Sequence, residues 1–174
     1  MIQKCIAVAA CVLMIIIMGC SPIIVSCDCK EVKSHGFGAG RAGGNSYQVC
    51  CNVPLTSSKW QHNRLEHLEG YSPKLVFSVS GFNVDKVNKE DIAGLKIEIK
   101  KILINNISYK QNLLVTLNPV VTPRANEHPI LIPQQSITIH AKPGDVCVIL
   151  WRVLDRPESM MQGYCHLLLA YLEG

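Results

Sequence analysis

The sequence predicts a mainly β fold, an antiparallel β-sandwich or a jelly-roll-like arrangement with one short helix. Apolar and polar residues alternate with a period of two in several stretches from residue 74 onward, which is the pattern of half-buried strands. Turn-forming Pro and Gly residues separate these stretches at short intervals, as in all-β domains. Strands do not alternate with long helical segments, so a parallel α/β sheet is not expected.

Composition limits the class of protein. The chain has 174 residues, enough for one domain, and 48% of them are hydrophobic whereas 17% are charged. Such a chain can bury a core, so disorder of the whole chain is not expected. The net charge is +4, and the densest basic stretch, Lys96, Lys100 and Lys101, is interrupted by Glu98. We predict no nucleic-acid partner, because such partners need clustered cations.

The opening segment has the pattern of an export signal. The apolar residues 6–18 follow Lys4 and have the length of a signal-peptide core. We predict residues 1–26 as a signal peptide, cut near Ser26 or Cys27, which makes the protein secreted. Two alternatives stay open: lipid is attached after cleavage before Cys20, or the uncharged segment is not cut and anchors the chain in a membrane. A membrane partner is expected only in those two cases.

The cysteines point to the same compartment. Removal of the leader leaves an even number, which favours disulfides outside the cytosol. We expect Cys27 and Cys29 to bond the adjacent Cys50 and Cys51, and the two remaining cysteines to bond each other. A metal site is the alternative, but zinc ligand pairs usually have two to four residues between them, and these pairs do not. We predict no metal and no cofactor. The disulfide candidates are Cys27, Cys29, Cys50, Cys51, Cys147 and Cys165.

Residues 27–57 are rich in Cys and Gly and are predicted as an N-terminal segment ahead of a sandwich domain at 58–174. The glycines at 38, 40 and 43 have the spacing of a dinucleotide motif, but no apolar strand precedes them, so we interpret them as a surface loop. The short helix is predicted near 59–69. Ser58 and Gln61 have the spacing of a capping box there, and Gly70 follows as a stop.

Strands are predicted in order along the rest of the chain. Residues 74–82 and 94–105 alternate, and the apolar positions shift by one residue at Lys100 and Lys101, which predicts a β-bulge. Asn105 and Asn106 predict a turn before the next strand. Two proline-bearing stretches at 118–129 and 131–135 are expected to be extended loops or edge segments.

The last third of the chain completes the predicted sheets. Residues 135–154 predict a hairpin with its turn at Pro143 to Asp145. Its second strand, 146–154, is apolar on both faces and is therefore expected in the centre of a sheet. Residues 165–172 predict a final strand.

Few residues indicate a functional site. Asn106 begins an N-glycosylation sequon at the predicted turn, so it is a candidate for a glycan. Arg152, Asp155 and Arg156 follow the predicted central strand and form a candidate recognition rim. We predict no catalytic residue, because no grouping of nucleophile, base and acid stands out.

These observations predict an exported, non-enzymatic β-sandwich that binds a protein or glycan partner, or copies of itself. A membrane-tethered envelope component, held through Cys20 or the uncut leader, is the first alternative. A small secreted hydrolase is the second, and it would need His128, His140 and His166 to converge in space.

Overall fold

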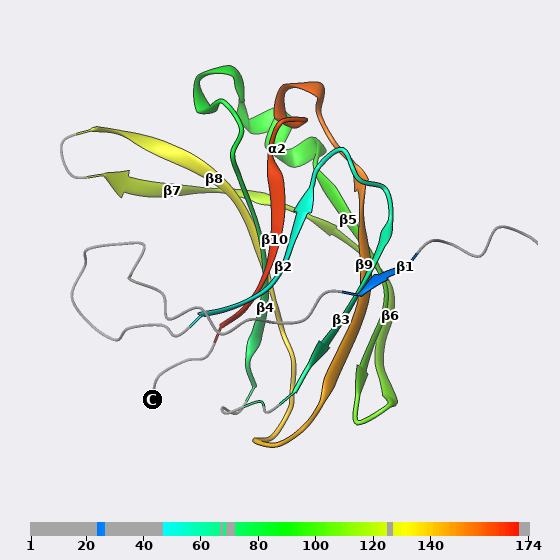
Figure 1. The fold of residues 1–174 in the computed structure, drawn as a ribbon. Helices are drawn as coiled ribbons and strands as arrows, with labels where there is room; N and C mark the ends of the chain where they lie inside the picture. The colour runs from blue at the N-terminus through cyan, green and yellow to red at the C-terminus, as the bar shows by residue number, and fades with distance from the viewer. Residues whose placement is uncertain (1–23, 27–46, 67, 69–71, 125–126, 171–174) are drawn as a thin grey trace, which may run out of the picture.

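Two five-stranded sheets pack face to face in a sandwich-like arrangement (Figure 1). The computed structural model describes residues 24–26, 47–66, 68, 72–124 and 127–170. Sheet A has the strand order β1-β3-β9-β5-β6, and sheet B has the order β2-β10-β4-β8-β7. Neighbouring strands are antiparallel except β1 and β3, which run parallel. The predicted mainly β fold built from antiparallel sheets is therefore confirmed.

The elements have the following bounds. Sheet A contains β1 (Ile24–Ser26), β3 (Trp60–Leu65), β5 (Lys96–Ile104), β6 (Ile107–Thr116) and β9 (Cys147–Asp155). Sheet B contains β2 (Tyr47–Pro54), β4 (Lys74–Ser80), β7 (Asn118–Arg124), β8 (Glu127–Thr138) and β10 (Tyr164–Ala170). The helical elements are η1 (Val84–Lys86), α2 (Lys89–Gly94) and η2 (Glu158–Met160).

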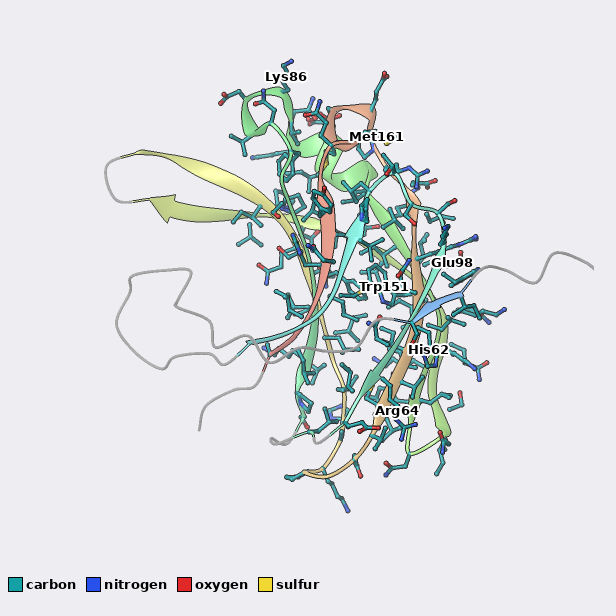
Figure 2. The ribbon with its side chains drawn as sticks, viewed as in Figure 1. His62, Arg64, Lys86, Glu98, Trp151 and Met161 are labelled. Atoms are coloured by element: carbon teal, nitrogen blue, oxygen red, sulfur yellow. The ribbon has the colours of Figure 1, made fainter. Side chains whose placement is uncertain are left out.

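The core lies between the sheets. Trp151 of β9 is fully buried, and its ring meets the ring of Phe77 of β4 edge-on with centroids 5.1 Å apart. Figure 2 shows Trp151 in the space between the two sheets. Burying one large apolar side chain stabilises a fold by about 1.5–3 kcal/mol. The inward-facing residues of both sheets form one continuous apolar cluster, which holds the sheets together.

The helix predicted near 59–69 is wrong, because Trp60–Leu65 is strand β3. Gln61, Asn63 and Leu65 are buried, whereas His62 and Arg64 face outward, which is the period of a strand. Two of the inward residues are polar, so the alternation is hidden when only apolar residues are counted. The one α-helix described is α2, and Asn88 and Asp91 form its capping box.

The predicted bulge and turn are both confirmed. The register of β5 against β9 shifts between Ile99 and Lys101, so one residue of β5 is extra at this point. Asn105 and Asn106 have φ values of 50° and 66° and join β5 to β6 as a two-residue turn. Positive φ at both positions is typical of the turns that match the twist of a hairpin, and Asn tolerates it.

The hairpin predicted over residues 135–154 is wrong in its pairing. β8 belongs to sheet B and β9 to sheet A, so the turn at Gly144 carries the chain from one sheet to the other. The predicted central strand is confirmed, since β9 lies between β3 and β5. The final strand is confirmed as β10. The proline-bearing stretches form the paired strands β7 and β8, of which β7 is an edge.

Two strands lie in segments that the sequence assigned elsewhere. β2, within the predicted N-terminal segment 27–57, is an edge strand of sheet B and pairs with β10. β1, at the end of the predicted leader, pairs with β3. Cleavage near Ser26 would remove β1 and leave β3 as the edge of sheet A. Among the described residues, no helix is long and apolar enough to cross a lipid bilayer.

Candidate binding groove

An open groove of about 640 Å³ lies between β6 of sheet A and β8 of sheet B. We call it the strand-edge groove; its walls are residues 113–116 of β6 and 135–138 of β8. It arises where two paired strands separate. β7 and β8 are bonded as far as Asn118 and Gln134, and beyond that point β8 stays in sheet B while the chain before Asn118 belongs to sheet A.

The β8 wall presents to the groove backbone groups that are not paired with any described strand. Ile139 N donates to Pro73 O, so the odd-numbered residues of this part of β8 make the hydrogen bonds to β4. In an antiparallel ladder the backbone N–H and C=O groups of the even-numbered residues then point to the opposite side of the strand, away from β4. Ser136 and Thr138 therefore direct their N–H and C=O groups into the groove, where no described strand pairs with them.

The β6 wall has the same property. Leu117 N donates to Leu95 O, and the register continues through Val115 opposite Ile97. By the same alternation, Leu114 and Thr116 turn their backbone groups away from β5 and toward the groove. β6 is the edge of sheet A.

Side chains supply part of the bonding that a further strand would provide. Gln135 Nε2 donates to Ser136 O at 3.3 Å, and the backbone N of His140 donates to the Tyr109 hydroxyl at 3.2 Å. At the opposite end, Asn118 Nδ2 donates to Gln135 Oε1 at 2.6 Å. The groove thus lies between two contacts made by side chains: Tyr109 with His140 N joins the two sheets, and Asn118 with Gln135 joins β7 to β8 within sheet B.

The floor of the groove is apolar. Val115 is buried, and Leu113 and Ile137 are half-buried and pack against the main core cluster. Leu113 and Ile137 come from different sheets, so the groove opens on the side of the core between the sheets. Apolar side chains of a ligand in the groove would therefore pack against residues that already contact the core.

The predicted rim residues lie elsewhere, and the chain itself engages their charges. Arg152 bonds Glu98 Oε2 through Nε at 2.7 Å and Nη2 at 2.6 Å, and its guanidinium lies 4.5 Å from the centroid of the Trp60 ring. Asp155 Oδ2 pairs with Lys96 Nζ at 3.2 Å. Both pairs join β9 to β5 on the outer face of sheet A.

The third rim residue does not join these pairs. Arg156 Nη1 donates to Ser57 O at 3.3 Å. The structure therefore brings Arg152 and Asp155 to one face but uses all three rim residues in contacts within the chain. An exposed ion pair such as Lys96–Asp155 stabilises by about 0–1 kcal/mol.

The histidines considered for a hydrolase do not gather in one place. His140 contacts Ser72 just before β4, whereas His166 lies opposite Ser78 further along that strand. Six residues of strand separate these positions by roughly 20 Å. The side chain of His128 lies outside the described residues. Within the described part of the chain, no cluster of three His, Cys, Asp or Glu residues could hold a metal ion.

His166 does contact a hydroxyl. Its Nε2 lies 2.6 Å from Ser80 Oγ, and burial lowers the pKa of the imidazole below its ordinary value. In a catalytic pair of this type, a neutral imidazole is the base and the serine hydroxyl in contact with it is the nucleophile. Its direct neighbours on β2 and β4 are Asn52 and Ser78, which are uncharged, so neither supplies the carboxylate that orients such a base.

The cysteine pairing predicted between Cys147 and Cys165 is not formed. Cys147 begins β9 beside Leu65 at one end of sheet A, and Cys165 begins β10 beside Val79 at the opposite end of sheet B. Cys165 is a buried thiol, and burial raises its pKa. Cys51 is buried next to it and contacts Gln61 Oε1 at 3.9 Å. Cys20, Cys27 and Cys29 and the side chain of Cys50 lie outside the described residues.

The glycosylation candidate Asn106 is exposed in the β5–β6 turn. Its neighbour Asn105 is held in place: its Nδ2 donates to Asp145 at 2.8 Å and its Oδ1 accepts from Val146 N at 2.9 Å. The first asparagine thus fixes the turn, and the sequon asparagine is accessible from solvent.

The strand-edge groove was not anticipated from the sequence. Its lining residues are ordinary strand residues. They line a groove only because the folded chain places β6 and β8 in different sheets, with a gap between them. The prolines at 119 and 133, which face each other where the strands begin to part, are the nearest signal in the sequence. The chain matches no protein-family model and no curated protein. Its function is therefore inferred from this geometry.

Proposed function

We propose that the protein is a binding module that captures an extended peptide segment of another protein in the strand-edge groove. One observation supports this most directly. Leu114 and Thr116 on one wall, and Ser136 and Thr138 on the other, direct backbone N–H and C=O groups into the space between them. A peptide strand added at such an edge gains main-chain hydrogen bonds and places alternate side chains in pockets.

The apolar floor supports a peptide over a glycan. Leu113, Val115 and Ile137 would receive alternate apolar side chains of an added strand, which removes apolar surface from water at about 25 cal/mol per Å². The groove contains no aromatic platform among its described lining residues. A partner with small apolar residues at every second position fits these features best.

Hydrogen exchange with a synthetic probe tests the proposal. The probe is the blocked hexapeptide acetyl-Val-Thr-Val-Thr-Val-Thr-amide, which is uncharged. Binding should slow amide exchange at Ser136 and Thr138 on one wall and at Leu114 and Thr116 on the other. Protection confined to another strand edge, such as β2, or no protection at saturating peptide would overturn the proposal.

A proline variant sharpens the test. Ser136→Pro removes an N–H that points into the groove but leaves the bonds of Gln135 and Ile137 to β4 in place. It should weaken the peptide about tenfold, equivalent to about 1.4 kcal/mol. Ser136→Ala keeps the N–H and should bind like the original protein. Equal binding by both variants would argue against main-chain pairing at this edge.

We also infer that the module works outside the cytosol, in the secreted form or tethered through its N-terminal segment. The apolar stretch at 6–18 and the cysteine content support this. Intact-mass analysis of the protein from its native source distinguishes the forms. A chain that begins near Cys27 indicates secretion, a lipid adduct on Cys20 indicates the tethered form, and an uncut chain indicates a retained anchor.

Disulfides from Cys27 and Cys29 to Cys50 and Cys51 belong to the same proposal. The two close spacings support a staple of this kind in an oxidising compartment. Oxidation of Cys51 would replace its present contact with Gln61. A peptide map made without reduction tests the staple, and recovery of all four as thiols from an exported sample would contradict it.

A further inference from the structure

The two ends of the strand-edge groove differ in charge. At one end, Lys110 and His140 are grouped around Tyr109: Lys110 Nζ lies 5.5 Å from the Tyr109 ring centroid, and the His140 ring centroid lies 6.4 Å from it. At the other end, the uncharged side chains of Asn118 and Gln135 bond each other.

Within the described part of the chain, no contact pairs the basic end with a carboxylate. Lys110 Nζ lies over the ring of Tyr109, which is uncharged. The Nδ1 atom of His140 is 3.4 Å from the Ser72 hydroxyl, which is neutral. No Asp or Glu is among the described residues that line the groove. An anionic group at this end would therefore meet a cation without displacing an internal carboxylate.

We infer that the peptide strand bound in the groove is acidic at one end, and that its carboxylate lies against Lys110 and His140. This inference rests on the proposed capture of an extended strand. Complementary charges at the rim of a binding site fix the register and direction of the partner. The backbone edges supply general affinity, and the basic end selects the partner and its orientation.

The selection acts at one end because the groove is long compared with the range of electrostatic forces. From Gln135 to His140 the β8 wall spans five residue steps, roughly 17 Å. At physiological ionic strength the screening length is about 8 Å. An acidic residue beside Asn118 would therefore gain little from Lys110.

Three blocked hexapeptides test this inference by fluorescence anisotropy. They are the uncharged Val-Thr probe, the same probe with Asp at its first position, and the same probe with Asp at its last position. One of the two Asp peptides should bind about fivefold more tightly than the uncharged probe at low salt, and the other should not. The favoured position reports the direction in which the peptide lies.

Two lysine variants provide the matched control. Lys110→Gln should abolish the advantage of the favoured Asp peptide, measured as the ratio of its affinity to that of the uncharged probe in the same variant. Lys86→Gln makes the same change of net charge at the opposite end of the molecule, where Figure 2 labels this side chain, and should preserve the advantage. The fivefold advantage should also shrink in high salt.

The outcomes separate the two proposals. Equal affinity of the Asp and uncharged peptides, an equal gain at both Asp positions, or an equal loss in the two lysine variants would overturn the acidic-end inference while peptide capture stands. Failure of the uncharged probe to bind and to protect the walls would overturn strand capture itself.

Discussion

Trp151 donates its indole N–H to Asn63 Oδ1 at 2.8 Å, and both side chains are fully buried between the sheets. The contact joins β9 to β3 within sheet A. It explains why a polar residue occupies an inward position of β3. A buried indole N–H without an acceptor lowers the stability of the fold. The Asn63 amide oxygen supplies that acceptor, which allows a tryptophan at this position of the core.

Asn63→Ala should therefore destabilise the fold by about 3 kcal/mol, because the Trp151 N–H loses its acceptor and a small cavity forms. Urea unfolding followed by tryptophan fluorescence measures the change. Arg64→Ala, at the neighbouring outward position of the same strand, should change stability by less than about 0.5 kcal/mol. Equal midpoints for the two variants would show that the buried contact has little energetic value.

Gly163 should not tolerate a side chain. A Cβ at this position would lie 2.9 Å from Ser80 O and 3.1 Å from Met160 O, and both neighbours are backbone atoms that cannot turn away. Gly163→Ala should cost about 1–3 kcal/mol, as for other overpacked sites. Gly94→Ala is the control, since its Cβ would meet only Pro157 at 3.5 Å and lies in a helix. Thermal unfolding that ranks Gly94→Ala as the less stable variant would contradict this account.

His166 should make the fold sensitive to mild acid. Burial holds the folded-state pKa below its ordinary value of 6.5. Above pH 6.5 both states are neutral and the group has no effect. As the pH falls from 6.5 toward the folded pKa, the unfolded chain takes up a proton that the folded chain does not, so stability decreases. His166→Gln should flatten the dependence of urea midpoints on pH in this window, and an unchanged slope would contradict the prediction.

Cys165 should be unreactive while the protein is folded. Burial raises the pKa of its thiol, and the thiolate is the form that reacts with iodoacetamide. Peptide mapping should find Cys165 unlabelled under native conditions and labelled in urea. A Cys147–Cys165 cross-link should be absent from the same map. Its presence would require the two ends of the sandwich to approach each other.

Glycosylation at Asn106 should leave the fold unchanged in a host that can add the sugar. The side chain is exposed, and the turn is fixed by Asn105 rather than by Asn106. Asn106→Gln should remove any glycan without altering the unfolding midpoint. Asn105→Ala should lower the midpoint, because it removes the contacts to Asp145 and to Val146 N. The reverse order would show that the roles of the two asparagines are exchanged.

Much of the local structure could be predicted from the sequence. Ile97 and Ile99 alternate with charged residues, the shift at Lys101 predicted the bulge, and the Asn105–Asn106 pair predicted the turn. Each of these features depends on neighbours along the chain, where periodicity and backbone preference act directly. The helix predicted near 59–69 failed because the inward face of β3 includes Gln61 and Asn63, whose burial depends on partners elsewhere in the chain.

The sequence by itself determined the bulge, the Asn105–Asn106 turn and most of the strands after residue 74, because these follow from local patterns of side chains. Only the tertiary structure decided which strands meet. It placed β8 and β9 in different sheets, kept Cys147 away from Cys165, and separated Ser136 from Leu114 so that two strand edges face an open groove. Pairing between distant residues is set by the packing of the whole core, and a candidate site made of backbone edges has no side-chain motif to mark it.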